Sequence, residues 1–484
     1  MQRGEEAPKK VINKKRKKLC GKIRFSDKFF ITCTLKKVYK EIAMEYLIVA
    51  VFFIGYLFIT VEHQVKIDKT ISALGMAVVC WTILKTANLP IFEIDKGLVP
   101  LAEHYEGGNP QAIDSLLLYH LGKVAEILFF LIGAMTIVEI IDMHRGFEII
   151  KKMIKTRRKK KLLWVMGIVA FFLSSLIDNL TTIIIMITIL RKLVPFREER
   201  IWYASLLIIA ANAGGAWSPI GDVTTTMLWM ANKVTAMRLI DYVVLPAVFC
   251  FLVPFAIASF MPIFKGKLDM PQMDKTMAYK SSTPILIIGV LGIIFVPIFK
   301  SLFHLPPYLG MLFSLATVWF FSELLKPNTE LAEGDKPSFS VHSALGRIEH
   351  SSILFFLGIL LAVAALEVTG VLFNFAGTLS QVVPNENIVV MILGFASAVI
   401  DNVPLVAAAI GMFQEPLDAS LWHFIAFSAG TGGSLLIIGS AAGVAAMGME
   451  KIDFFWYVKH ISWLALIGFL AGCGSLIAVE TWFR

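Results

Sequence analysis

The sequence has few charged side chains and few cysteines for its length. Charged residues make up 17% of the 484 positions, whereas 57% are hydrophobic and the mean hydropathy is +0.73. Soluble domains are roughly a quarter charged, so this composition excludes an ordinary soluble protein and indicates a polytopic membrane protein. The five cysteines are scattered and form no CxxC or Cys/His spacing, which argues against a disulfide framework or a structural zinc site.

Basic residues are missing from one long stretch, because no lysine or arginine occurs between Arg347 and Lys451. Elsewhere they gather in blocks, with KKVINKKRKK at 9–18 and eight basic residues at 151–161. Since these blocks flank apolar segments, we interpret them as cytoplasmic loops and not as a nucleic-acid-binding surface. Residues 1–45 lack the features of a signal peptide, and we expect a basic cytoplasmic tail that contacts membrane lipid.

Apolar segments of membrane length predict an all-α polytopic fold. We expect ordinary spans at 46–61, 70–87, 114–142, 240–263, 283–300, 307–325, 350–377 and 453–481. Four further regions differ, because 162–194 and 388–413 carry an acid at their centre, whereas 201–231 and 421–449 are rich in glycine and small residues.

The acid at each centre is followed by asparagine, giving Asp178-Asn179 in LSSLIDNLTTIII and Asp401-Asn402 in FASAVIDNVPLVAA. A carboxylate in a membrane-length apolar run is costly, and such residues mark functional sites by default. In each copy a serine, Ser174 or Ser397, lies four residues earlier, which places it on the same helical face as the acid.

Ordered landmarks indicate that the chain is duplicated. An ILFF motif, the IDN motif, a Gly-Gly pair and a further glycine recur in the same order in both halves. We therefore expect a first membrane half at 46–264, a cytoplasmic linker at 265–282 and a second membrane half at 283–484. Chance similarity among apolar segments is the alternative that these landmarks disfavour.

The charges beside the two Asp-Asn regions predict re-entrant helical hairpins that enter from opposite faces. Basic residues stand at both ends of 162–194, and its first arm of 16 residues would span about 24 Å as a helix, short of the ~30 Å membrane core. No basic residue flanks 388–413. Two such hairpins meeting near the midplane are the plan of an inverted-repeat transporter. With these sides, either the tail lies opposite 151–161 or there is an additional crossing before residue 114, and the sequence leaves both open.

The glycine-rich regions predict two broken transmembrane helices, since Gly-Gly and proline unwind a helix and exposed backbone must line a cavity. The first contains Asn212, Asp222, Thr224 and Thr225, whereas the second has Ser440 where Asp222 would be and offers Ser434. Close helix packing is the alternative explanation of the glycines. The predicted site is asymmetric, with two acids from the first half and one from the second. We expect no compensating basic residue nearby, and three such carboxylates would form a strong cation site.

Carboxylate, amide and hydroxyl oxygens are hard ligands suited to a small cation. Helix capping is the competing role for the two Asp-Asn pairs. For Na⁺ we expect Asp178, Asn179, Asp401 and Asn402 as ligands, with Thr182 near the first pair. Glu126 is a candidate ion- or proton-binding residue, and pairing with Lys123 or a place at the membrane interface are the alternatives. Burial disfavours the charged form of a carboxyl group and bound Na⁺ favours it, so cation and proton would compete for the same acids and exchange follows from alternating access.

Other classes of protein fit less well. An ion-coupled carrier of anions such as dicarboxylates or arsenite is the nearest alternative, but acids at both hairpin tips disfavour an anionic substrate. No His/Glu zinc pattern, Gly-x-Ser nucleophile or Lys/Asp pair supports an intramembrane enzyme. A channel would not need paired hairpins with titratable tips.

The motifs SSLIDNLTT, AANAGGAWSPIGDVTTTMLW and ASAVIDNVPLVAA resemble those of the NhaD-type sodium/proton antiporters of the ion transporter superfamily, over most of residues 46–484. The resemblance implies exchange of Na⁺ or Li⁺ for H⁺ without a cofactor, across a bacterial-type inner membrane. It also implies a homodimer with an elevator-like motion of a hairpin-bearing part against a scaffold. By similarity, important family positions fall on Ser174, Asp178, Asn179, Asn212, Asp222, Thr224, Thr225, Ser397, Asp401 and Asn402.

Overall fold

A computed structural model describes most of the chain as helices. The described residues are 27–60, 67–93, 99–100, 109–149, 156–268, 279–325, 341–383, 385–399 and 402–483. Asp401 and the basic run at 9–18 lie outside them. Five of the described helices are long and apolar enough to cross a membrane: Pro110–Met143, Ala236–Ala258, Ser282–Phe303, His350–Val368 and Ser462–Val479. The prediction of an all-helical multi-span membrane protein is therefore confirmed, with one two-residue strand pair, β1 (Phe92–Glu93) and β2 (Val99–Pro100), as the exception.

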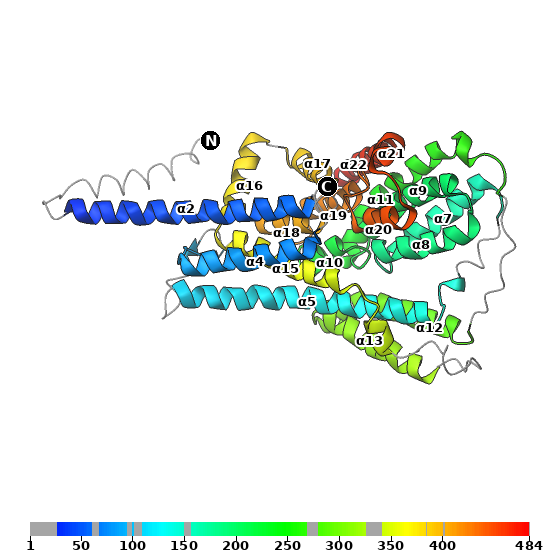
Figure 1. Cartoon of the computed structure of the whole chain (residues 1–484), viewed down its shortest axis with the longest axis horizontal. Helices are drawn as coiled ribbons and strands as arrows, with labels where there is room; N and C mark the ends of the chain where they lie inside the picture. Colours follow the sequence, from blue (N-terminus) through cyan, green and yellow to red (C-terminus); the bar gives the residue numbers. More distant parts are fainter. Residues whose placement is uncertain are drawn as a thin grey trace.

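The first three long helices are antiparallel neighbours: α2 (Asp27–Thr60), α4 (Lys69–Thr86) and α5 (Asn109–Met143) (Figure 1). The Cys80 thiol of α4 lies 4.0 Å from the Ile48 carbonyl oxygen of α2, and Lys85 near the end of α4 pairs with Asp114 near the start of α5. The beginning of α2 thus lies at the end of the molecule opposite Met143. Helix α2 also begins at Asp27, so the expected boundary at 45 falls inside a continuous helix.

The next helices follow the predicted interruptions closely. They are α7 (Lys159–Ser174), α8 (Asn179–Leu193), α9 (Arg197–Ala216), α10 (Val223–Met230) and α11 (Ala236–Ala258), followed by the short 3₁₀ turn η2 (Pro262–Phe264). Helices α12 (Ser282–Phe303) and α13 (Pro307–Leu324) then pack on each other and on α5.

The second half contains two breaks within segments that we expected to be single spans. Its helices are α14 (Val341–Leu345), α15 (His350–Val368), α16 (Val371–Val382), α17 (Glu386–Ser397), α18 (Asn402–Met412), α19 (Ser420–Gly432), α20 (Ala441–Glu450), α21 (Phe454–His460) and α22 (Ser462–Phe483). The expected span 350–377 ends early because Gly370 adopts φ +74°, a left-handed conformation that interrupts the helix. The expected span 453–481 is divided at Ile461.

Helix α9 lies at the centre of the fold. Every residue from Tyr203 to Ala216 is buried, and α9 contacts α7, α8, α11, α19 and α20. A helix that is apolar on all sides and buried on all sides is a core element and not a lipid-facing span. This position brings both helix breaks of the first half against those of the second.

Two of the predicted basic loops meet at one end of the molecule. Residues Arg158 and Lys267 form an antiparallel bridge, the Lys159 amide donates to the Gly266 carbonyl at 3.2 Å, and the Leu268 amide donates to the Arg157 carbonyl at 2.8 Å. We call this end of the molecule the basic-loop end. The described parts of the two segments, 156–161 and 265–268, therefore lie together at this end.

Candidate functional site

The break between α7 and α8 presents Asp178 as the residue that begins α8. Its Oδ1 accepts a hydrogen bond from the Thr181 amide at 2.8 Å, and its Oδ2 accepts from the Thr181 hydroxyl at 2.7 Å. The helix-capping role that competed with ion binding in the sequence is therefore present. Capping occupies one lone pair on each oxygen and leaves further acceptor capacity on a half-buried carboxylate.

Serine side chains tie each predicted hairpin to a glycine-rich helix in the same way. The Ser174 hydroxyl of α7 donates to the Ala211 carbonyl of α9 at 2.6 Å. The Ser397 hydroxyl of α17 donates to the Ala429 carbonyl of α19 at 2.7 Å. Both serines are fully buried, so each bond satisfies a hydroxyl that would otherwise be costly to bury.

The two glycine-rich helices break with nearly the same backbone geometry. Asp222, before α10, has φ −146° and ψ 150°, and Ser440, before α20, has φ −145° and ψ 152°. Their side chains act differently, because the Ser440 hydroxyl accepts from the Gly443 amide at 3.1 Å. The Asp222 side chain makes no such cap, and its Oδ2 accepts from the Asn402 side-chain amide at 3.1 Å.

A neutral cluster joins the start of α8 through α9 to the α19–α20 break. The Asn179 amide donates to Asn212 Oδ1 at 3.0 Å. The Asn212 amide in turn donates to the Ser434 hydroxyl at 2.9 Å and to the Ser440 hydroxyl at 3.0 Å. Both amide hydrogens of Asn212 are used, and all four side chains are buried. These four residues, Asn179, Asn212, Ser434 and Ser440, form what we call the amide–hydroxyl cluster.

Glycines allow the helices to approach closely enough for these contacts. A Cβ added at Gly214 would overlap the backbone of Phe171 in α7, and one at Gly432 would overlap the backbone of Gly394 in α17. The close packing that we considered as an alternative role for these glycines therefore exists together with the polar contacts. Packing and site formation depend on the same residues.

Four of the predicted site residues line one small cavity of about 70 Å³, which we call the carboxylate cavity. They are Asp178, Asn179, Asp222 and Asn402. The rest of its lining is mostly apolar and includes Phe130 of α5 and Met311 of α13. A volume of this size holds a few waters or one partly hydrated small cation, since a water needs roughly 10–15 Å³ on this scale.

Lys69 also lines the carboxylate cavity, and sequence reasoning missed it. Its ammonium lies 4.4 Å above the centre of the Phe355 ring, a favourable cation–π geometry. Our expectation that no basic residue lies near the acids is wrong on this point. The only local signal was its position after Asp68, which caps α4 through Thr70, and nothing in the sequence links that helix to Asp178.

The remaining predicted residues lie around the cavity or away from it. Thr182 and Thr224 are buried, and neither hydroxyl has a hydrogen-bond partner among the described residues. The Thr225 hydroxyl donates to the Asp222 carbonyl at 2.9 Å and so stabilises the break. Glu126 of α5 does not line the cavity, and its charge acts on Lys300 of α12.

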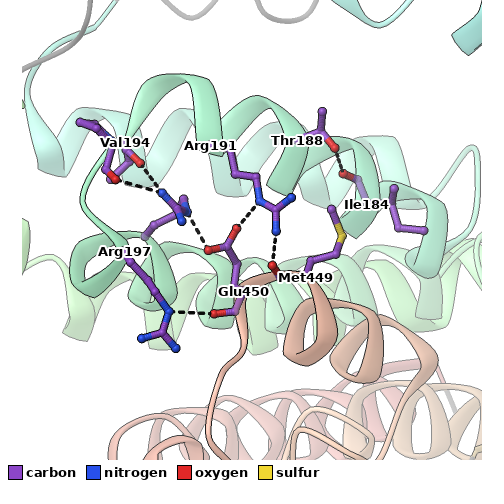
Figure 2. A network of polar contacts seen from close by, with 9 residues as sticks. Ile184, Thr188, Arg191, Val194, Arg197, Met449 and Glu450 are labelled. Atoms are coloured by element: carbon purple, nitrogen blue, oxygen red, sulfur yellow. Dashed lines mark hydrogen bonds and ion pairs between the residues drawn. The ribbon is translucent and has the colours of Figure 1, made fainter.

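An ion-pair network around the buried Glu450 carboxylate fixes the end of α20 (Figure 2). Glu450 is 1% exposed at its side chain, and its two oxygens lie 2.7 Å from Arg191 Nε and 2.7 Å from Arg200 Nε. Arg197 donates to the backbone carbonyls of Glu450 at 3.2 Å and Lys451 at 2.6 Å. These arginines, which we predicted only as a basic flank of the first hairpin, hold α20 against the α8–α9 connection.

The arrangement is that of a multi-pass ion transporter, with carboxylates and amides converging where several helices break. The model of the citrate transporter family matches residues 47–425. Sodium/proton antiporter 1 of Arabidopsis thaliana is 42% identical over 436 residues, covering 89% of this chain and 71% of that protein. Sodium/proton antiporter 2 of the same plant is 40% identical, covering 89% of this chain and 98% of that protein.

The Na⁺/H⁺ antiporter NhaD of Alkalimonas amylolytica is 31% identical over 466 residues, covering 90% of each chain. The chain belongs to the NhaD-type family of sodium/proton antiporters, within the broader group that the citrate transporter model describes. It is therefore a transporter-family protein and not an enzyme, as the sequence predicted.

Proposed function

We propose that the protein exchanges Na⁺ or Li⁺ for H⁺ at the carboxylate cavity. The observation that carries the proposal is the convergence of Asp178, Asn179, Asp222 and Asn402, from both halves of the chain, on one small cavity. Oxygen ligands of this kind suit a hard monovalent cation. Asp401, the third acid, lies outside the described residues, and we propose it as a ligand on its sequence position alone.

Competition between ion and proton is the proposed coupling. A buried carboxylate favours its protonated form, and a bound cation favours the ionised form. Each cation that binds therefore displaces protons from the same groups. If the site changes sides only when it is loaded, the two gradients are linked with opposite signs. The apparent KM for Na⁺ should then rise as the pH falls, because protons compete.

We propose that α7–α8 and α17–α18 are re-entrant hairpins of an inverted repeat. Three pairs of matching features support this: the two serine-to-carbonyl bonds, the contacts of Gly214 with α7 and of Gly432 with α17, and the nearly equal backbone angles at Asp222 and Ser440. Helices α7 and α8 also pack on each other, as do α17 and α18.

An elevator-like motion and a homodimer complete the proposal. The cavity is lined by hairpin residues and also by Phe130 and Met311, so it lies between the proposed moving part and the rest of the molecule. Cross-linking in nanodiscs would test the dimer.

The membrane that holds the protein is a separate question. The resemblance predicts a bacterial plasma membrane, but the relatives come from both a plant and bacteria. Cell fractionation would distinguish a bacterial membrane from a plant membrane.

An ion-coupled anion carrier is the second candidate, because the family model that matches the chain is that of a citrate transporter. Two carboxylates lining the cavity disfavour a carboxylate substrate, since like charges repel in a buried site. Lys69 is the observation in its favour, as a cation that faces the same cavity.

Proton flux in inside-out vesicles separates the two candidates. Addition of Na⁺ or Li⁺ should release the imposed pH gradient, whereas K⁺ and citrate should not. Asp178→Asn should abolish the Na⁺ response while leaving the protein folded in the membrane, and Asp401→Asn should do the same. Uptake of labelled citrate by the wild-type protein, with no Na⁺-driven proton movement, would replace our proposal with the anion carrier.

A further inference from the structure

A larger cavity of about 490 Å³ lies beside the carboxylate cavity. Its walls are the C-terminal half of α5 and one face of α8, completed by Tyr279 and residues 347–349. Seven charged residues line it, and we call it the charged cavity: Glu139, Asp142, Arg145, Glu148, Lys192, Arg347 and Glu349. Since a water needs roughly 10–15 Å³, a space of this size with a charged lining has room for many water molecules.

The charged cavity opens toward the basic-loop end. Lys192, on the last turn of α8, pairs with Glu148 at 3.1 Å across it. The adjoining start of α9 is tied to the start of α7 by the ion pair of Glu199 with Lys159 at 2.6 Å, and Lys159 is part of the contact between the two basic segments. The charged cavity therefore belongs to one side of the membrane.

A thin apolar partition separates the two cavities. Met135 and Val138 of α5 and Leu180 of α8 line both of them, so these three side chains lie between the charged cavity and the carboxylate cavity. Thr181 lines the charged cavity, and its amide and hydroxyl hold the Asp178 carboxylate at 2.8 Å and 2.7 Å. Thr181 therefore contacts both the charged cavity and the Asp178 carboxylate of the proposed ion site.

We propose that the charged cavity is the access route for cations and protons to Asp178 from the basic-loop end, with Met135, Val138 and Leu180 as its inner gate. The proposal rests on the proposed ion exchange. Three apolar side chains exclude water and thereby block an ion that cannot be hydrated. Two of them belong to α5 and one to α8, so a small displacement of α8 along α5 would join the cavities.

The charges of the route favour cations. Four acids and three basic residues line it, and one of the basic residues, Lys192, is paired with Glu148. The positive charge of Arg347 lies close enough to interact with the carboxyl groups of Glu139 and Asp142. Glu349, at the start of α15, is exposed and close enough for its charge to act on Asp178. A carboxylate at the mouth of a narrow route raises the local cation concentration and so assists entry.

Cysteine labelling tests the route without relying on transport. In a background with all five cysteines replaced by serine, Thr188→Cys places a thiol in the charged cavity and Leu291→Cys places one on the exposed face of α12, outside it. A thiol reacts as its thiolate, which forms in water and is suppressed in apolar surroundings. A charged, impermeant thiol reagent should therefore modify Thr188→Cys at least ~10-fold faster than Leu291→Cys, from the basic-loop side only.

The gate is tested with a thiol behind the partition. Ala134 lines the carboxylate cavity but not the charged cavity. Ala134→Cys should react slowly, and at least ~10-fold faster when Leu180→Ala is added, because the smaller side chain opens the partition to water. Equal labelling of Ala134→Cys in both backgrounds would remove Leu180 from the gate. Folded but unreactive Thr188→Cys would overturn the route.

Transport kinetics test the role of Glu349. Glu349→Gln should raise the apparent KM for Na⁺ presented at the basic-loop side several-fold, with little change in kcat and with a weaker effect at high salt. Glu386→Gln is the matched control, since Glu386 is an exposed acid that begins α17 and does not line the cavity. An equal KM change in both variants would contradict a specific role for Glu349.

The labelling outcome is independent of the exchange itself. If Asp178→Asn keeps exchanging Na⁺ while Thr188→Cys labels as expected, the proposed function fails and the route stands. If Asp178→Asn abolishes exchange and Thr188→Cys does not label, the reverse holds.

Discussion

At the α9–α10 break the second half-helix begins with Asp222, whereas at the α19–α20 break it begins with Ser440. The partner position differs in the opposite sense. Asn212 in α9 fills the space beside Ser440, but its counterpart in α19 is Gly430, and a Cβ there would lie 3.4 Å from Asp222 Oδ2. At each break a larger side chain thus faces a smaller one: Asn212 faces Ser440, and Asp222 faces Gly430.

This difference separates two tasks within one backbone plan. The amide–hydroxyl cluster has no formal charge, and its hydrogen bonds hold the start of α8 to the α19–α20 break. The Asp222–Asn402 pair lines the carboxylate cavity and carries a charge into it. In the proposed inverted repeat the two breaks share one backbone geometry, and the side chains at two positions would make one break structural and the other ionic.

The largest expected effect comes from removing the shared frame. Gly214→Ala and Gly432→Ala each place a methyl group in the backbone of a neighbouring helix. Overpacking of a rigid contact costs about 3 kcal/mol or more, so neither variant should yield a monodisperse peak in size-exclusion chromatography. Gly75→Ala, where a Cβ meets nothing within 4 Å, is the control. Normal folding of one variant but not the other would show that the two frames are unequal.

Loss of the ionic side chain should abolish exchange without loss of the fold. Asp222→Asn keeps the size of the side chain but removes the charge beside Asn402, so Na⁺-driven proton movement in inside-out vesicles should fall to background. Asp114→Asn, on an exposed carboxylate of α5, should exchange normally. Substantial exchange by a folded Asp222→Asn would shift the ionic role to Asp178 and Asp401.

A matched pair of alanine variants separates stability from ion affinity. Asn212→Ala leaves the buried Asn179 amide and Ser434 hydroxyl without this partner, at about 1–3 kcal/mol for each unpaired group, and should lower the midpoint of thermal unfolding in detergent. Gly430→Ala places a methyl group about 3.4 Å from Asp222 Oδ2 and should instead raise the apparent KM for Na⁺ several-fold. The opposite pattern, with affinity lost at Asn212 and stability lost at Gly430, would reverse our assignment of the two tasks.

The smallest expected effects should be equal in the two halves. Ser174→Ala and Ser397→Ala each remove one buried hydroxyl-to-carbonyl bond, and each should cost about 1 kcal/mol of unfolding free energy with exchange preserved. Thermal unfolding of both variants side by side makes the measurement. A large effect of one serine alone would point to a direct role in ion binding at that hairpin.

Much of this plan could be read from the sequence, because its signals are local. The break before Asn179, the break before Val223 and the start of α18 at Asn402 follow from acids, glycines and proline inside apolar runs. The division of α15 from α16 also had a local signal, Thr369-Gly370, but a single glycine in an apolar run does not reveal that it takes a left-handed conformation.

Features that depend on distant partners had no such signal. Lys69 reaches the carboxylate cavity because α4 packs along α15, which no local pattern specifies. The role of Gly430 depends on the size of Asp222, a residue of the other half of the chain. Asp178 was found because charge in an apolar run is conspicuous, whereas its bond to Thr181 needed the helix start to be placed to the residue.

The Glu450 network has a consequence for how the chain is assembled in the membrane. Arg191 precedes its carboxylate partner by 259 residues in the chain and is therefore synthesised first. The arginines at the α8–α9 connection have no Glu450 to pair with until the intervening helices have been inserted. Unpaired arginines are costly in the bilayer, so their charges favour keeping that connection at the membrane surface during this interval. Arrival of α20 then places the single Glu450 carboxylate between Arg191 and Arg200 and offsets one of the three positive charges, so completion of the second half stabilises the end of the first hairpin region.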